Sequence, residues 1–244
     1  MNGRSAPSPD GGHPQPPRVV AVAGNMGAGK SSLVEWLRQQ FGMVAFFEPN
    51  EENPYLSDFY ADMPRWAMSS QLFFLVRRFQ IHREVLLRAA LDPRPVVQDR
   101  TLYEDAEVFA AHLHEAGYID ARDWATYQDL YRTLREEIRP PDLMIYLRCP
   151  LKTLTQRIRR RGRDFERKIP RAYLASLERL YEAWFAAYDL SPTLVIDSDR
   201  IDYVERLFDR MEVIEAIRAR LGASGPDSCM APLAPARRVG RTST

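Results

Sequence analysis

Short apolar runs alternate with long amphipathic stretches along most of the chain. Each apolar run is continuous rather than alternating, a pattern typical of strands that are covered on both faces. We therefore interpret the runs as strands of a buried sheet. They lie at Val19–Ala23, Val44–Phe47, Pro95–Gln98, Leu143–Leu147 and Thr193–Ile196.

The stretches between these runs carry apolar residues at helical spacing. They fall at residues 30–40, 64–91, 103–117, 120–138, 151–160, 170–188 and 201–220. Strands separated by helices favour a parallel sheet with right-handed crossovers. The sequence thus predicts an α/β fold of three layers, in which helices flank a five-stranded parallel sheet.

Both ends of the chain have a different composition. Residues 1–17 are rich in proline, and residues 222–244 are rich in Gly, Ser, Pro and Ala. Such segments bury too little apolar surface to fold, so we expect two disordered tails around one domain at 18–221. The first tail has neither the apolar core of a secretory signal nor the arginines of a transit peptide, which favours a cytoplasmic protein.

The composition excludes several classes of protein. The chain holds 34 Lys and Arg against 33 Asp and Glu, for a net charge of +1, which argues against nucleic-acid binding by bulk electrostatics. No apolar run approaches the ~20 residues of a membrane-spanning helix. Cys149 and Cys229 are too few and too far apart for a disulfide framework or a zinc site.

The most specific motif is a G-x4-G-K-S sequence that follows the first predicted strand and opens a helix. This context is the one in which the motif binds phosphate. Its glycines let successive N–H groups and the helix N-terminus point at one anion. We expect Lys30 to bridge the β- and γ-phosphates of a nucleoside triphosphate and Ser31 to hold Mg2+. The predicted phosphate-binding residues are Gly24, Asn25, Met26, Gly27, Ala28, Gly29, Lys30, Ser31 and Ser32.

Charged residues follow the second and third predicted strands. Glu48 lies at the end of the second run, in the motif F-F-E-P, and Asp99 and Arg100 begin the motif D-R-T. The carboxyl ends of the strands in such a sheet share one edge, so these side chains are expected near the phosphate-binding loop. There Glu48 can accept the proton of an attacking hydroxyl, Asp99 can serve Mg2+ and Arg100 can cover developing charge. A solvated glutamate and a strand-end ion pair are the plainer alternatives.

Polar residues share faces of two predicted helices. Gln71 and Arg78 are seven apart within a largely apolar stretch, and Asp105 and Phe109 are four apart. Together they can form a slot in which Gln71 faces a base edge, Arg78 pairs with Asp105 and Phe109 stacks on the base. The alternative is a satisfied polar network buried between helices.

An arginine-rich segment, R-I-R-R-R-G-R-D-F-E-R-K, spans residues 157–168. Arg157, Arg161 and Arg163 lie on either side of Gly162, where a loop can fold over a triphosphate. Arginine forks suit phosphate oxygens. A solvated basic face or an RNA-contacting patch is the alternative, but few aromatic residues are present for base stacking. We therefore predict an arginine-rich lid and no nucleic-acid partner.

Four motifs in order resemble those of the deoxynucleoside kinase family. They are G-N-M-G-A-G-K-S-S-L, F-F-E-P, F-Y-A-D-M-P-R-W-A-M-S-S-Q-L-F-F-L-V-R-R-F and D-R-T-L-Y-E-D. The resemblance runs from about residue 18 to residue 200 and is strongest to the bacterial deoxyadenosine/deoxyguanosine kinase branch. It implies the P-loop kinase fold and a homodimer formed by helix packing.

The resemblance also implies roles for single residues. Gln71 matches the family's base-reading glutamine, Arg78 and Asp105 its arginine–aspartate pair, and Tyr60 its contact to the sugar 3′-hydroxyl. Members that prefer thymidine generally lack the pair, so the resemblance favours purine deoxynucleosides or deoxycytidine.

The lid matches the family's pattern with one departure. Arg157, Arg161 and Arg163 match its phosphate contacts, and Glu166 matches the carboxylate that holds the sugar 3′-hydroxyl. The chain has Asp164-Phe165-Glu166 where the family has paired acidic residues.

These observations predict a nucleotide-salvage enzyme that moves the γ-phosphate of ATP, with Mg2+, to the 5′-hydroxyl of a deoxynucleoside. Its catalytic residues would be Glu48, Lys30 and Arg100. A thymidylate-like nucleoside monophosphate kinase is an alternative, because it shares the loop and the E-P and D-R steps. A non-catalytic nucleotide-binding subunit is another, although such a subunit is expected to lose these three side chains.

Overall fold

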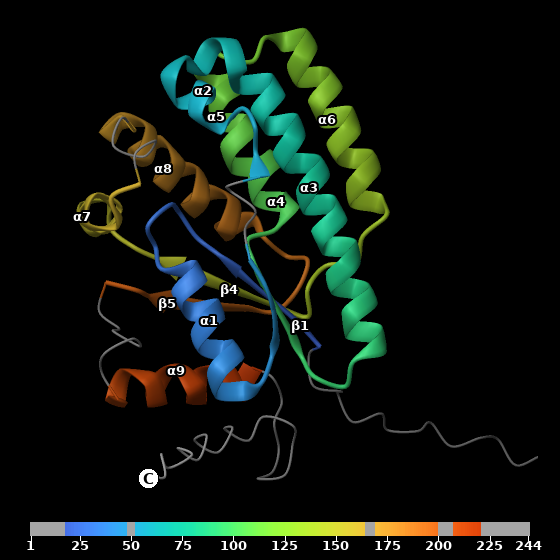
Figure 1. Cartoon of the computed structure of the whole chain (residues 1–244), viewed down its shortest axis with the longest axis vertical. Coiled ribbons are helices and arrows are strands. Elements are labelled where there is room, and N and C mark those ends of the chain that lie inside the picture. Colours follow the sequence, from blue (N-terminus) through green and yellow to red (C-terminus); the bar gives the residue numbers. More distant parts are fainter. Residues whose placement is uncertain (1–17, 48–51, 164–168, 200–206, 221–244) are drawn as a thin grey trace, which may run out of the picture.

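A single sheet lies at the centre of the computed structural model, which describes residues 18–47, 52–163, 169–199 and 207–220 (Figure 1). All its pairings are parallel, in the order β2-β3-β1-β4-β5. The strands are β1 (Val19–Ala23), β2 (Val44–Phe46), β3 (Val96–Asp99), β4 (Leu143–Arg148) and β5 (Thr193–Asp197). The predicted five-stranded parallel sheet is confirmed, and every strand ends within one residue of its expected position.

Helices fill the connections between the strands. They are α1 (Lys30–Phe41), α2 (Leu56–Ala61), α3 (Met63–Leu91), α4 (Leu102–Glu104), the π-helical segment η2 (Asp105–Ala110), α5 (Ala111–Glu115), α6 (Ala121–Glu136), α7 (Leu151–Arg161), α8 (Arg171–Ala187) and α9 (Leu207–Arg220). The predicted helices are found, except that residues 201–206 of the last one lie outside the described part. The short helix α2 was not expected from the sequence.

The side chains of β1 alternate between two apolar cores. Val20 and Val22 pack with α1, α7 and α9, whereas Ala21 and Ala23 pack with α3, η2, α6 and α8. Figure 1 shows α1 and α9 together on one face of the sheet and α3, α6 and α8 on the other. The three-layer architecture predicted from the continuous apolar runs is therefore confirmed.

The topology brings two connections to one edge of the sheet. Because β1 and β3 are parallel neighbours with Val22 opposite Asp99, the loop after β1 and the turn after β3 emerge side by side. Gly29 holds a left-handed conformation with φ of 103° just before α1 begins at Lys30. The phosphate-binding motif therefore forms the expected strand–loop–helix unit.

Several predictions concern segments outside the described residues. Both expected tails lie there, as do Glu48, Glu166 and residues 164–168 of the lid. Of the helices that the structure describes, none combines the length and the apolar character needed to cross a bilayer.

Candidate active site

The loop after β1 curls around the side chain that it carries. The Lys30 ammonium is buried and donates hydrogen bonds to the carbonyl oxygens of Gly24 at 2.9 Å and Asn25 at 3.1 Å. Left-handed backbone at Gly24 and Gly27, with φ of 145° and 80°, produces this curvature. The loop and the N-terminus of α1 thus form an anion cradle with a cation at its centre.

Neighbouring elements hold the loop in this shape. The Asn25 amide donates to the Leu174 carbonyl of α8 at 3.2 Å, and the N–H of Met26 donates to the Asn25 side chain at 2.7 Å. From α7, the Arg157 guanidinium donates to the carbonyl of Ala28 at 3.1 Å. Contacts from α7 and α8 therefore hold the loop in its curled shape.

Ser31 and Asp99 meet beside the cradle. The Ser31 hydroxyl donates to Asp99 Oδ2 at 2.6 Å, and Asp99 is buried at the end of β3. A hydroxyl and a carboxylate side by side are oxygen ligands of the kind that Mg2+ takes when phosphates complete its shell. The two residues therefore suit the ion that the sequence predicts for them.

The backbone of Arg100 has an unusual conformation and is held by hydrogen bonds on both sides. With φ of 65° it is the one non-glycine residue of left-handed conformation among the described residues. Its N–H donates to the Val22 carbonyl at 2.9 Å, and its carbonyl accepts from the Gln98 amide at 2.9 Å. Strained backbone of this kind is characteristic of functional sites. It turns the chain from β3 toward the phosphate-binding loop.

The guanidinium of Arg100 reaches the same carbonyl as Lys30. Its Nη2 donates to the Gly24 oxygen at 3.4 Å, and its Cζ lies 4.5 Å from the centre of the Phe109 ring. The two cations therefore converge on the carbonyl of Gly24 at the start of the loop.

One cavity of about 850 Å³, counting its open mouth, adjoins both cations. The predicted site residues that line it are Met26, Gly27, Gly29, Lys30, Ser31, Ser32, Tyr60, Gln71, Arg78, Arg100, Asp105, Phe109, Arg161 and Arg163. Residues separated by more than 130 positions thus share one site.

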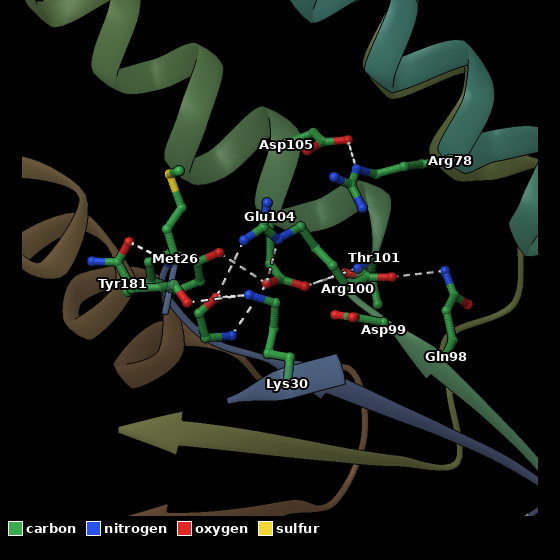
Figure 2. Close-up of polar contacts among 12 residues, drawn as sticks. Met26, Lys30, Arg78, Gln98, Asp99, Arg100, Thr101, Glu104, Asp105 and Tyr181 are labelled. Atoms are coloured by element: carbon green, nitrogen blue, oxygen red, sulfur yellow. Dashed lines mark hydrogen bonds and ion pairs between the residues drawn. The ribbon is translucent and has the colours of Figure 1, made fainter. Parts of the chain in front are cut away.

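Polar side chains in the cavity wall come from α3 and η2. Arg78 and Asp105 form an ion pair at 2–3% side-chain exposure, as the sequence predicts (Figure 2). Gln71 is also buried, and its Oε1 accepts no hydrogen bond from the described residues. A buried acceptor of this kind is costly unless a ligand or water satisfies it, so Gln71 favours a polar ligand in this cavity.

The arginines of α7 and the following turn divide into two groups. Arg161 and Arg163 line the cavity, on either side of the left-handed Gly162 that ends α7. The Arg157 guanidinium instead donates to Ser198 at the end of β5, at 2.6 Å to its carbonyl, in addition to Ala28. In this structure Arg157 therefore links the phosphate-binding loop to the end of β5 and is not part of the cavity wall.

Sequence reasoning assigned no role to Glu104, although it lies in D-R-T-L-Y-E-D. Its side chain is completely buried between the phosphate-binding loop, Thr101 and Tyr181 of α8. Thr101 and Glu104 form a capping box at the start of α4. The spacing T-x-x-E is the sequence signature of that motif and indicates at least the capping contact.

The fold and this site together define a P-loop phosphotransferase, with a loop curled around a buried lysine, a hydroxyl–carboxylate pair beside it and an adjoining cavity. A family model described as "Deoxynucleoside kinase" matches residues 20–221. The chain belongs to the deoxynucleoside kinase family. It is therefore an ATP-dependent enzyme that phosphorylates a deoxynucleoside.

Named relatives agree with this assignment. The chain is 33% identical to the deoxyadenosine kinase of Lactobacillus acidophilus, over 85% of this chain and 98% of the relative. It is 32% identical to the deoxyadenosine/deoxycytidine kinase of Bacillus subtilis, over 75% and 84%. A solved deoxyadenosine kinase from M. mycoides, with dCMP and a flexible dCDP bound as products, superimposes with a TM-score of 0.71 at 30% identity, covering 82% of this chain and 99% of that one. These relatives favour the nucleoside kinase over the two alternatives.

Proposed function

We propose that this kinase phosphorylates purine deoxynucleosides and deoxycytidine in preference to thymidine. The observation that carries the proposal is the buried Gln71 amide, which lies in one cavity with the Arg78–Asp105 pair. A carboxamide offers one acceptor and two donors, and the pair adds an acidic acceptor and a cationic donor. This set suits a base edge that both donates and accepts.

The chemistry of the bases explains the preference. Adenine, cytosine and guanine each carry an exocyclic amino donor, whereas thymine has none and carries a methyl group next to its O4 acceptor. Thymine therefore gives Asp105 no amino group to receive and brings an apolar methyl toward a charged wall. A site that leaves a buried polar group unpaired rejects such a substrate.

An acceptor panel tests the proposal. With ATP as donor, kcat/KM is measured for deoxyadenosine, deoxyguanosine, deoxycytidine and thymidine. We expect thymidine to be at least about 100-fold poorer than the best of the other three. Equal efficiency for thymidine contradicts the preference. Including dAMP as an acceptor separates nucleoside from monophosphate phosphorylation in the same experiment.

In phosphoryl transfer, different residues of the site would bind the triphosphate, stabilise the developing charge and hold the metal. Lys30, Arg161 at the end of α7 and Arg163 just after it would hold the triphosphate. Arg100 would cover the charge that develops on the transferred phosphoryl group. Ser31 and Asp99 would hold Mg2+, which neutralises phosphate charge when it is bound. Since the transition state is loose, such alignment and charge stabilisation supply most of the catalysis.

Glu48 is the proposed general base. It lies two residues beyond the end of β2, and β2 pairs in parallel with β3, so the chain leaves β2 at the edge that carries Asp99. A carboxylate there can accept the proton of the 5′-hydroxyl late in the reaction. We expect Glu48→Gln to lose about 100-fold or more in kcat and to keep its deoxynucleoside affinity. Near-normal kcat in this variant contradicts the role.

Two contacts to the sugar and a homodimer complete the proposal. Tyr60 lines the cavity and would contact the sugar 3′-hydroxyl together with Glu166. On the outside of α3, Val76, Leu87 and Leu91 are 43%, 60% and 75% exposed. They lie along one face of the helix at helical spacing. Exposed apolar side chains on one helix face provide a surface for contact with a second copy of the chain.

A further inference from the structure

Glu104 is a fully buried carboxylate at the centre of the site, and none of the roles above explains its position. Its exposed fraction is 0%. Burying an ionised carboxylate costs several kcal/mol unless hydrogen bonds and opposite charges compensate it. The groups that compensate Glu104 therefore indicate what it does.

The two oxygens of Glu104 have different partners (Figure 2). Oε2 accepts from the N–H and the hydroxyl of Thr101, at 2.8 and 3.2 Å, which completes the helix cap. Oε1 accepts from the N–H of Gly24 at 3.3 Å and the Tyr181 hydroxyl at 3.0 Å, and Arg100 Nε lies 3.7 Å from it. Backbone N–H groups can only donate, so both oxygens act as acceptors.

Capping α4 requires the Oε2 contacts alone. The contacts of Oε1 instead join three parts of the site: the first residue of the phosphate-binding loop, Arg100 beside the cavity, and α8, which begins soon after the lid. Burial raises the pKa of Glu104, while Arg100 and Lys30 oppose that shift. The carboxylate and these cations are all buried, so the positive charges of Arg100 and Lys30 help to stabilise the ionised form of Glu104.

We propose that Glu104 is a positioning residue for phosphoryl transfer, whose Oε1 sets the Arg100 guanidinium and the first amide of the loop at fixed places relative to each other. This inference rests on the kinase function described above. It follows from the loose transition state, in which misplacing one stabilising cation is costly. Glu104 itself touches neither substrate and transfers no proton.

The test compares Glu104→Gln with the wild type in kcat and in KM for both substrates. Glutamine can still accept from Thr101, but its NH2 group then faces Gly24 N–H and Arg100, donor against donor. We expect kcat to fall about 10- to 100-fold and KM for the deoxynucleoside to change less than about threefold. Glu182→Gln is the matched control, because it makes the same change in an ion pair with Arg148 on the outside of α8. We expect it to leave kcat unchanged.

A double-mutant cycle separates positioning from stability. If Glu104 acts through Arg100, Glu104→Gln adds little to the loss caused by Arg100→Met. Losses that multiply, or a kcat within about threefold of wild type in a folded variant, overturn the inference. If Glu104→Gln does not fold, kcat is measured for Glu104→Asp, which keeps the charge on a side chain shorter by one methylene group. The inference then predicts a similar fall in kcat. A wild type that phosphorylates no deoxynucleoside contradicts the kinase function instead.

Discussion

Gly24 lies where the structure leaves no room for a β-carbon. Its φ of 145° belongs to glycine, and a β-carbon there would lie 2.8 Å from the carbonyl oxygen of Leu147 on β4. That oxygen belongs to an inner strand of the sheet and cannot move aside. The loop therefore lies against β4 at the same residue whose N–H meets Glu104 and whose carbonyl receives Lys30 and Arg100.

Replacing Gly24 by alanine tests this close approach. We expect Gly24→Ala to lower the free energy of unfolding by at least about 2 kcal/mol more than Gly117→Ala. Gly117 also has a positive φ, of 76°, but nothing lies within 4 Å of its missing β-carbon. It therefore controls for the cost of left-handed backbone alone, about 1–2 kcal/mol. Urea unfolding measures both, and equal losses would show that contact with β4 is unimportant.

The elements that the sequence predicts well are those with long apolar patterns. Strands β1, β3 and β4 bury continuous runs, and helices α1, α3, α6, α7 and α8 each bury one side. The limits of these elements agree with the prediction to within a few residues. Helix α2 has six residues and buries only Leu56 and Phe59. Such a segment is too short for helical periodicity to stand out.

Local distortions and side-chain directions depend on tertiary packing and are invisible in the pattern. The π-helical turn at 105–110 places Asp105 and Phe109 in the cavity wall, although an α-helix was expected there. Arg157, Arg161 and Arg163 are alike in sequence, but Arg157 donates to Ala28 and Ser198. Only the packing of α7 against the loop distinguishes them.

The different positions of the arginines at the end of α7 and just after it give a testable prediction. We expect Arg161→Ala and Arg163→Ala each to lower kcat/KM for ATP on the order of 100-fold, because each removes a guanidinium from the phosphate end of the cavity. Arg160→Ala is the matched control. It removes an exposed arginine of the same helix, outside the cavity wall, and should change kcat/KM less than about twofold. Similar losses in all three variants would indicate a general effect of basic charge.

At the scale of the whole molecule, two buried histidines link folding to pH. His82 on α3 is fully buried, with Nε2 2.8 Å from the Arg139 carbonyl, and His112 on α5 lies edge-on to the Tyr173 ring at 4.9 Å. Burial lowers the pKa of both below the usual 6.5. Folding therefore favours the neutral imidazoles.

The sign of the effect follows from linkage. The stabilisation is complete above pH 6.5 and is lost as the pH falls from there through the lowered pKa values, by up to about 1.4 kcal/mol per pH unit for each proton. His82→Gln keeps a donor for the Arg139 carbonyl but cannot take up a proton. We expect denaturant unfolding between pH 7.5 and 5.5 to show a smaller loss for His82→Gln, and a smaller one still when His112→Gln is added. An unchanged slope in the double variant contradicts the assignment.

The proposed homodimer would use the outer face of α3, where Leu87 is exposed. In a two-fold dimer each interface residue occurs twice, so one substitution introduces two charges. We expect Leu87→Glu to give the mass of one chain by light scattering, where the wild type gives that of two. Met211→Glu places the same charge on a 51% exposed apolar residue of α9 and should leave the dimer intact. Dimers in both variants would place the interface elsewhere, and a monomeric wild type would contradict the dimer itself.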